Sequence, residues 1–341
     1  MKYRLTCLTP TLVGDGNWLS PIDYMVWKDQ VNVLDQRRIF KMLAKSPRLE
    51  PYLAQIRRAD RLDWASWGGY AQNYAGRRIP FEHPSLTGIW QAARPDVLHI
   101  PTFAGSGQGP LVPGSALKGA LRTALVWSRW KERGVEKIIE AAAQRVSGGD
   151  RIPRRLAQSS DTAEPKVLLG DALRTGGELK VFHSRTARLQ GSLTWKETPP
   201  SFVEMAAPGS AFEGHWTQTA DSRSLLTAAN AWSMALLDLH LAYAKQAGLA
   251  ALGASVEGLR FKAASAGQKS CLLPIGWGAG FLSKTAAPDT SSGSYRNILK
   301  AMPLYARAIQ SGLPFPKTRR VIHLNQQPAA IPGWILLEVA D

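Results

Sequence analysis

The chain has 341 residues, of which 45% are hydrophobic, and this length and composition suit a globular protein of about two domains. Its 42 basic and 26 acidic residues give a net charge of +16, so we expect a polyanionic partner. No run approaches the roughly 20 apolar residues of a membrane span, and MKYRLTCLTP lacks the apolar block of a signal peptide. We therefore expect a cytoplasmic protein that has no membrane partner.

The positive charge is spread evenly along the chain. Residues 1–150 and 151–341 each carry 21 basic and 13 acidic residues, an excess of +8 in each part, so the charge belongs to the folded body. The alternative is that the charge serves solubility alone. Only two cysteines occur, Cys7 and Cys271, without CxxC spacing, which indicates neither a disulfide framework nor a structural zinc site.

The first predicted elements are a strand, a hairpin and a helix. Apolar and polar residues alternate in KYRLTCLTP, the period of a half-buried strand. DYMVW and VNVL around KDQ predict a hairpin, and Asp35 is the expected N-cap of a helix over residues 36–45. Residues 66–109 are rich in Gly, Pro, Trp and Tyr without a sustained period, so we expect long surface excursions there.

A second organised part begins near Lys166 and repeats this order. KVLLGDAL and ELKVFHS have strand character, and FVEMA and AFEGHWTQ around PGS predict a second hairpin. A long helix over 222–247 should end at Gly248, followed by a helix over 295–310 and the strands RRVIHL and WILLEV. The sequence therefore predicts an α+β fold of two related units, residues 1–150 and 151–341, joined by a polar linker over 147–165.

The segment PGSALKGALRTAL, residues 113–125, predicts an amphipathic helix with a basic stripe. Ser115 is the expected N-cap, and the leucines fall on one apolar face. Lys118 and Arg122 lie one turn apart on another face, which Arg129 and Arg133 continue.

This predicted helix start suits a phosphate group. Free amides of the first turn, a hydroxyl and two cations are typical phosphate ligands, and Gly119 beside the stripe would let another backbone approach. Because Lys118 precedes Gly119, the segment is not a nucleotide-binding GxxxxGK[ST] loop. The alternative is an ordinary helix with a solvated basic face.

Two further segments carry candidate binding residues. In CLLPIGWGAGFLSKT, residues 271–285, three alternating glycines offer backbone amides and Trp277 could stack on a base; the spacing GxGxG differs from the dinucleotide motif GxGxxG. A buried tight turn explains the same glycines. PKTRR, residues 316–320, adds cations before a strand, or forms a solvated sheet edge. The candidate residues of these segments are Gly276, Trp277, Gly278, Gly280, Lys284, Lys317, Arg319 and Arg320.

Taken together, the segments resemble the RAMP superfamily of CRISPR effector proteins. PGSALKGALRTAL looks like its phosphate-contacting helix start, LLPIGWGAGF like its glycine-rich loop, and LTCLTPTLVGDG like its first strand and turn. Within the superfamily, the layout, with LLGDAL in the middle and PKTRR near the end, most resembles the type III-A effector subunit that caps the filament at the 3′ end of the CRISPR RNA.

The resemblance implies a fold and a function. The fold would be two ferredoxin-like (RRM-like) domains with long loop insertions. The function would be non-catalytic binding of the 3′ part of the guide RNA in a type III antiviral ribonucleoprotein. Its partners would be the repeating backbone and other subunits, with target RNA contacted indirectly. RNA contact would fall to Ser115, Lys118 and Arg122, and glycine-loop roles to Gly276, Gly278 and Gly280. No RNP1-like string of aromatic residues is evident on a predicted strand.

Two alternatives stay open. The first is a CRISPR-RNA-processing endoribonuclease that uses Asp15, Asp171 or a histidine. The six histidines show no HxH or HxxxH spacing, and turn-forming aspartate is the simpler interpretation of both acids, so the sequence indicates neither a metal site nor a catalytic residue. The second is a free-standing RNA-binding protein. No cofactor is indicated by either.

Overall fold

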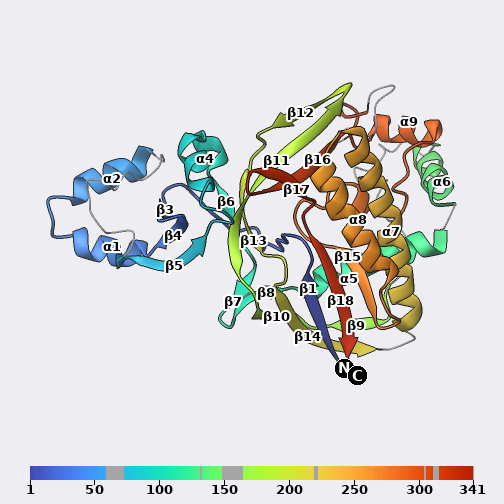
Figure 1. Ribbon diagram of the computed structural model, residues 1–341, viewed down its shortest axis with the longest axis horizontal. Helices are drawn as coiled ribbons and strands as arrows, with labels where there is room; N and C mark the ends of the chain where they lie inside the picture. The colour runs from blue at the N-terminus through green and yellow to red at the C-terminus, as the bar shows by residue number, and fades with distance from the viewer. Residues whose placement is uncertain are drawn as a thin grey trace.

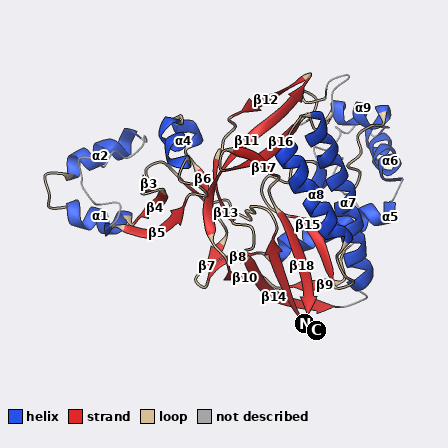
Figure 2. Cartoon of the chain, in the orientation of Figure 1, coloured by secondary structure: helices blue, strands red, loops and turns tan. Residues whose placement is uncertain are grey.

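The protein is an α+β molecule in which two antiparallel sheets lie between a group of helices and a projecting lobe (Figures 1 and 2). The α+β class expected from the sequence is thereby confirmed. The computed structural model describes residues 1–58, 73–130, 133–147, 164–218, 222–302, 305–309 and 315–340.

The larger sheet holds the first strand of the chain in its middle. β1 (Lys2–Cys7) pairs with β14 (Ala211–Gln218) on one side and with β18 (Trp334–Ala340) on the other. Tyr3, Leu5 and Cys7 are buried, as their alternation predicts, and the chain termini lie side by side (Figure 1). The order is β15 (Ser270–Pro274), β18, β1, β14, β10 (Ala172–Gly176), β8 (Gly109–Val112) and β7 (Gly105–Ser106), with β9 (Val167–Leu169) also paired to β14.

The second sheet is organised around one long strand, β11 (Leu179–Gln190). Its order is β12 (Ser192–Lys196), β11, β16 (Thr318–Leu324) and β17 (Gln327–Ala330), with β13 (Phe202–Ala206) also paired to β11. The predicted hairpin of FVEMA and AFEGHWTQ is wrong: both segments are strands, but β13 pairs with β11 while β14 enters the larger sheet between β1 and β10.

Helices cover the larger sheet on one side and bury its core (Figure 1). The fully buried Trp216, Trp232 and Trp334 lie in the shared core. Gly248, at φ +67°, follows the long helix as predicted. The predicted last helix is shorter than expected. The helices beside the sheet are α5 (Gly114–Trp130), α7 (Ser222–Gln246) and α8 (Ala250–Ala264), with the short η4 (Leu282–Lys284) against α5. α6 (Gly134–Ser147) and α9 (Gly293–Ala301) pack against each other around a separate hydrophobic cluster.

The lobe on the other side contains the predicted hairpin and helix. β3 (Tyr24–Trp27) and β4 (Gln30–Leu34) turn at Lys28 and Asp29, which have φ of 50° and 57°. Asp35 Oδ1 accepts a hydrogen bond from Arg38 N (3.0 Å) and caps α1 (Gln36–Leu43), as predicted. The other elements are α2 (Leu49–Arg58), β5 (Ala75–Pro80), α4 (Leu86–Ala92), η2 (Pro95–Val97), and the pair β2 (Trp18–Leu19) and β6 (Ile100–Pro101).

The expectation that residues 66–109 form irregular excursions is wrong for residues 73–109. β5 joins β4 in a three-stranded sheet, and α4 packs Trp90 against Tyr24, so long-range pairing creates order that no local period indicates. Residues 66–72 lie outside the described residues, as does most of the expected linker.

The larger sheet combines strands from both sides of residue 150. The division into residues 1–150 and 151–341, and the two ferredoxin-like domains, therefore stay predictions. In the part of the chain that the structure describes, no helix has both the length and the apolar character of a membrane span.

Candidate nucleic-acid interface

The first turns of α5 and the glycine-rich loop, residues 275–281, form the two walls of one groove. The two segments are more than 150 residues apart in sequence, yet η4 at the end of the loop lies against α5. The groove has a volume of about 320 Å³. Its lining residues are Ser115, Ala116, Gly119, Ala120, Arg122, Thr123, Pro274, Ile275, Gly276, Ala279, Ser283 and Lys284.

The start of α5 differs from the prediction. The helix begins at Gly114, so Ser115 lies in the first turn and is not the N-cap. Gly114 N donates to Asp171 Oδ1 (2.9 Å), and Ala116 N donates to Pro113 O (3.0 Å). The protein itself therefore satisfies the amides of Gly114 and Ala116, while phosphate contact by the other amides of the first turn stays a prediction. Ser115 is exposed and presents its side chain at the groove.

Of the cations of the basic stripe on α5, Arg122 lines the groove, whereas Lys118 and Arg129 do not. Arg122 lines the groove from α5, and Lys284 lines it from the glycine-rich loop side. Lys118 is not a lining residue, and its Nζ lies 3.9 Å from Glu164 Oε2. Arg129 is exposed in the last turn of α5, also outside the groove. The groove therefore carries one cation from each motif.

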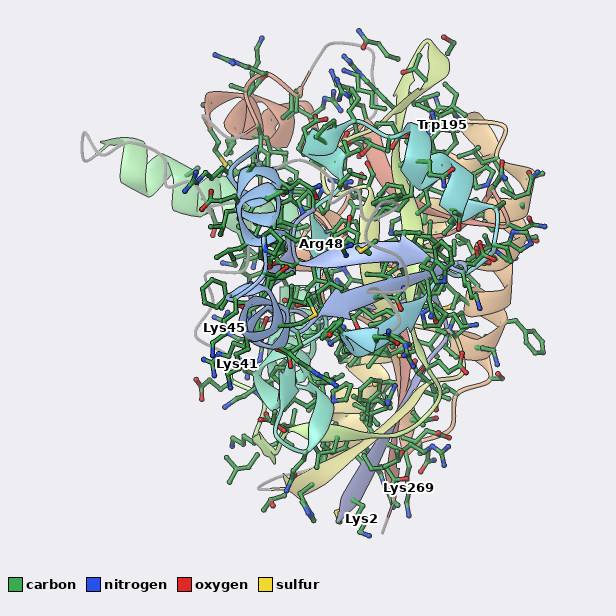
Figure 3. All side chains as sticks on the ribbon, turned by 90° about the vertical axis from the view of Figure 1, so that its left-hand side faces the viewer. Lys2, Lys41, Lys45, Arg48, Trp195 and Lys269 are labelled. Carbon is green, nitrogen blue, oxygen red and sulfur yellow. The ribbon has the colours of Figure 1, made fainter. Side chains whose placement is uncertain are left out.

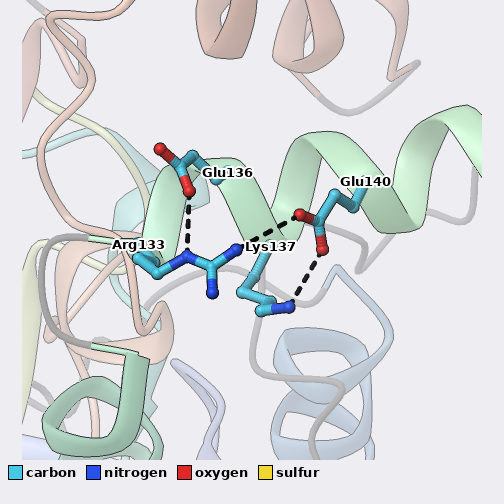
Figure 4. Close-up of polar contacts among 4 residues, drawn as sticks. All are labelled: Arg133, Glu136, Lys137 and Glu140. Carbon is cyan, nitrogen blue, oxygen red and sulfur yellow. Dashed lines mark hydrogen bonds and ion pairs between the residues drawn. The ribbon is translucent and has the colours of Figure 1, made fainter.

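The expected continuation of the stripe through Arg133 is wrong. α5 ends at Trp130, and Arg133 precedes α6, where its guanidinium contacts two acids (Figure 4). Arg133 Nε lies 3.1 Å from Glu136 Oε2, and its Nη2 lies 3.7 Å from Glu140 Oε1. Lys137 Nζ adds a contact of 3.0 Å to Glu140. These exposed pairs neutralise the charge that the stripe was expected to present.

Gly119 leaves an open place in the wall of the groove. A Cβ added there would meet no heavy atom within 4 Å outside the local helix, and the residue is exposed. The space beside Gly119 is therefore open, and the approach of another backbone there stays a prediction.

The glycines of the loop have a structural reason for being glycine. Gly276, Gly278 and Gly280 have φ of +73°, +83° and +70°. A Cβ at Gly276 would overlap Leu12 O, and Trp277 N donates to that same carbonyl (2.8 Å). The tight-turn interpretation thus accounts for the glycines, while Gly276 remains exposed at the groove.

Trp277 is half-buried, and one face of its ring is already occupied. The Arg320 guanidinium carbon lies 5.0 Å from the Trp277 ring centroid, a cation–π contact. Arg320 Nη1 also donates to Thr198 O (2.8 Å) and Pro200 O (3.2 Å). Arg320 therefore anchors the loop to the second sheet, and base stacking by Trp277 stays a prediction.

The cations of PKTRR line a second, larger cavity of about 670 Å³ together with Gly278 and Gly280. Ala279 and Ser283 border both spaces, so the cavity adjoins the groove. The Arg319 guanidinium carbon lies 4.6 Å from the Tyr243 ring centroid, and burial lowers the pKa of Arg319 to about 10. Burial, followed by the nearby charges of Arg188 and Lys196, lowers the pKa of Lys317.

Sequence reasoning missed several residues of these two spaces. Arg188 and Lys196 line the cavity from β11 and β12, and their alternation with apolar neighbours is the signal that could have placed them on one sheet face. Asp171, 57 residues after Gly114, gives no local sign that it caps α5.

The acids considered for catalysis have structural partners. Asp15 accepts hydrogen bonds from Asn17 N (3.0 Å) and Asn17 Nδ2 (2.9 Å), which forms a turn, and Asp171 caps α5. Within the described ranges, no three His, Cys, Asp or Glu side chains gather closely enough to hold a metal ion.

These observations define an α+β protein whose helix start and glycine-rich loop form a cationic groove. The sequence profile of the RAMP superfamily matches residues 4–175. The chain therefore belongs to the RAMP superfamily, as its motifs predict. A comparison with curated protein sequences gives no match.

Solved structures share the fold over almost the whole chain. One is a chain of the cryo-EM structure of a Csm–crRNA–target RNA ternary complex of a type III-A CRISPR-Cas system, with a TM-score of 0.71 and 19% identity over 99% of this chain and 100% of that chain. Another is the crystal structure of T. onnurineus Csm5, with a TM-score of 0.61 and 16% identity over 97% and 99% of the respective chains.

Proposed function

We propose that this chain is a non-catalytic, guide-RNA-binding subunit of a type III CRISPR effector ribonucleoprotein. In this role it binds the 3′ part of the CRISPR RNA and caps the backbone filament during antiviral defence. The observation that carries the proposal is the meeting of the two superfamily motifs at one groove, with Arg122 on one wall and Lys284 on the other. The net charge of +16 supports a polyanionic ligand.

The similar structures support the same role. Both match nearly the full length of this chain, and one comes from a complex that contains a CRISPR RNA and its target. We infer that the partners are the guide RNA and the other subunits of such a complex, with target RNA reached indirectly. Phosphate contacts at the groove would position the strand without reading its sequence.

Native purification followed by mass spectrometry tests this function. We expect the chain to co-purify with a guide RNA and several other subunits, in one copy per complex, as suits a filament cap. Recovery as a free monomer without RNA, or in several copies per complex, would contradict the proposal.

A second assay distinguishes binding from cleavage. We expect the purified chain to leave a labelled guide precursor intact with and without Mg²⁺. A specific cleavage product would favour the endoribonuclease alternative.

A further inference from the structure

The larger cavity next to the groove has the dimensions of a ligand site. Its volume of about 670 Å³ lies within the range of about 300–1,000 Å³ that is typical of small-molecule sites. It lies between the second sheet, the glycine-rich loop and the segment that precedes β16. The proposed phosphate contacts at α5 involve the groove alone. They leave the larger cavity without an assigned ligand.

One wall of the cavity is aromatic. The rings of Phe281, Tyr305 and Phe315 contact one another edge to face, with centroids 5.0 to 5.6 Å apart. Each ring therefore holds the other two in place. Such a wall offers apolar surface for a flat, aromatic ligand.

The rim of the cavity is cationic. Arg188 and Lys196 lie on neighbouring strands, and Lys317 stands close enough to both that their charges lower its pKa. Among the described residues that line the cavity, none is acidic. Arg188 Nε is buried and has no hydrogen-bond partner in the described part of the chain. A cluster of this kind is stabilised by a bound anion.

His240 supplies a polar group inside the cavity. This residue of α7 is 8% exposed, and its Nδ1 has no hydrogen-bond partner among the described residues. Burial, followed by the charge of Arg319, lowers the pKa of His240 to about 3, so the imidazole is neutral at pH 7. His240 therefore lines the cavity with a neutral polar ring, and the described residues leave the hydrogen-bonding capacity of its Nδ1 unused.

We propose that the cavity binds one unstacked nucleotide of the RNA, with the base against Phe281, Tyr305 and Phe315. The edge of the base bonds to His240, and its phosphate lies at the rim formed by Arg188, Lys196 and Lys317. The shared border at Ala279 and Ser283 lets one strand pass from the groove into the cavity. This inference rests on the proposed RNA-binding function and adds a base-binding site to it.

Crosslinking of the unaltered full chain tests the site directly. Single-stranded RNA with 4-thiouridine at every uridine is irradiated with the protein, and the crosslinked peptides are identified by mass spectrometry. We expect crosslinks at Tyr305 or Phe315. Crosslinks confined to α5 and residues 275–280 would overturn the inference while leaving the proposed function in place, and failure to bind RNA at all would overturn both.

Binding assays with base-free RNA provide an independent test. An RNA of abasic nucleotides has the same phosphates, so we expect it to bind at least about fivefold more weakly, as the loss of one stacked base predicts. The ratio of the affinities for base-containing and abasic RNA should fall in His240→Phe. In Arg188→Ala with Lys196→Ala, the slope of log affinity against log salt should flatten.

The matched control removes two charges at the far end of the molecule. Lys2 and Lys269 lie at the other end of the molecule from Trp195, the neighbour of Lys196 (Figure 3). Lys2→Ala with Lys269→Ala should therefore change neither the affinity ratio nor the salt slope. If His240→Phe folds and keeps the wild-type ratio, the inference is wrong, although Arg122→Ala could still weaken RNA binding through the groove.

Discussion

A substitution at Gly119 can test whether the groove face of α5 contacts a ligand. Glycine inside a helix costs about 1 kcal/mol relative to alanine, and the space around Gly119 is open. Gly119→Ala should therefore raise the free energy of unfolding by about 1 kcal/mol. It should also weaken RNA binding by about 1 kcal/mol or more, because the new methyl group enters the groove. Urea unfolding and equilibrium RNA binding measure the two effects.

Gly258 is the matched control for this substitution. It is also an exposed helical glycine, in α8, with no heavy atom within 4 Å of an added Cβ outside the local helix. Gly258→Ala should give a similar gain in stability and no change in RNA binding. Equal RNA affinity in Gly119→Ala and Gly258→Ala would show that no backbone approaches α5 at Gly119.

The burial of His323 leads us to expect that the free energy of unfolding falls in acid. Burial, and then the charges of His183 and Arg185, lowers its pKa to about 4, and its Nε2 has no hydrogen-bond partner in the described residues. Between pH 6.5 and 4 the unfolded chain binds more protons at this site, so the free energy of unfolding falls as the pH falls. From pH 7 to pH 5 the expected loss is about 2 kcal/mol.

Urea unfolding of His323→Phe at both pH values checks this result. The variant should lose about 2 kcal/mol less than the wild type between pH 7 and pH 5. His99→Phe, at an exposed histidine, is the control and should keep the wild-type difference. An unchanged difference in His323→Phe would contradict the buried, neutral state of this imidazole.

At the scale of elements, α5 depends on an acid from another segment. Because Asp171 accepts the hydrogen bond of Gly114 N, Asp171→Ala should lower the free energy of unfolding by about 1 kcal/mol, the usual effect of losing a helix cap. RNA cleavage by the assembled complex should keep the same products, since Asp171 acts on the helix. Loss of one specific product with normal stability and assembly would instead support a catalytic role.

The elements that could be predicted are those with local signals. The alternation in β1, the cap at Asp35 and the stop at Gly248 all act within a few residues, and the structure confirms each. The partners of β13 and β14 could not be predicted, because adjacency in sequence favoured a hairpin while burial in two different sheets decided the pairing.

At the scale of the whole molecule, the candidate site could be predicted only in parts. The helix segment and the glycine segment were each recognisable, but nothing local shows that Arg122 and Lys284 line the same groove. The cavity could not be predicted from the sequence, because its cations come from distant segments. Its cations at Arg188 and Lys196 lie on the second sheet, and the fold brings them beside PKTRR. Folding therefore brings cations from distant parts of the sequence to two adjoining spaces, which suits a polyanion.

The central claim is that the groove formed by α5 and the glycine-rich loop binds RNA phosphates. The direct test is the salt dependence of single-stranded RNA binding by Arg122→Ala with Lys284→Ala, compared with Lys2→Ala with Lys269→Ala. If both groove cations contact phosphates, the slope of log affinity against log salt should flatten by about 1.4, at roughly 0.7 per phosphate, for every RNA sequence. The control should keep the wild-type slope. Unchanged affinity and slope in a folded groove variant would contradict the claim.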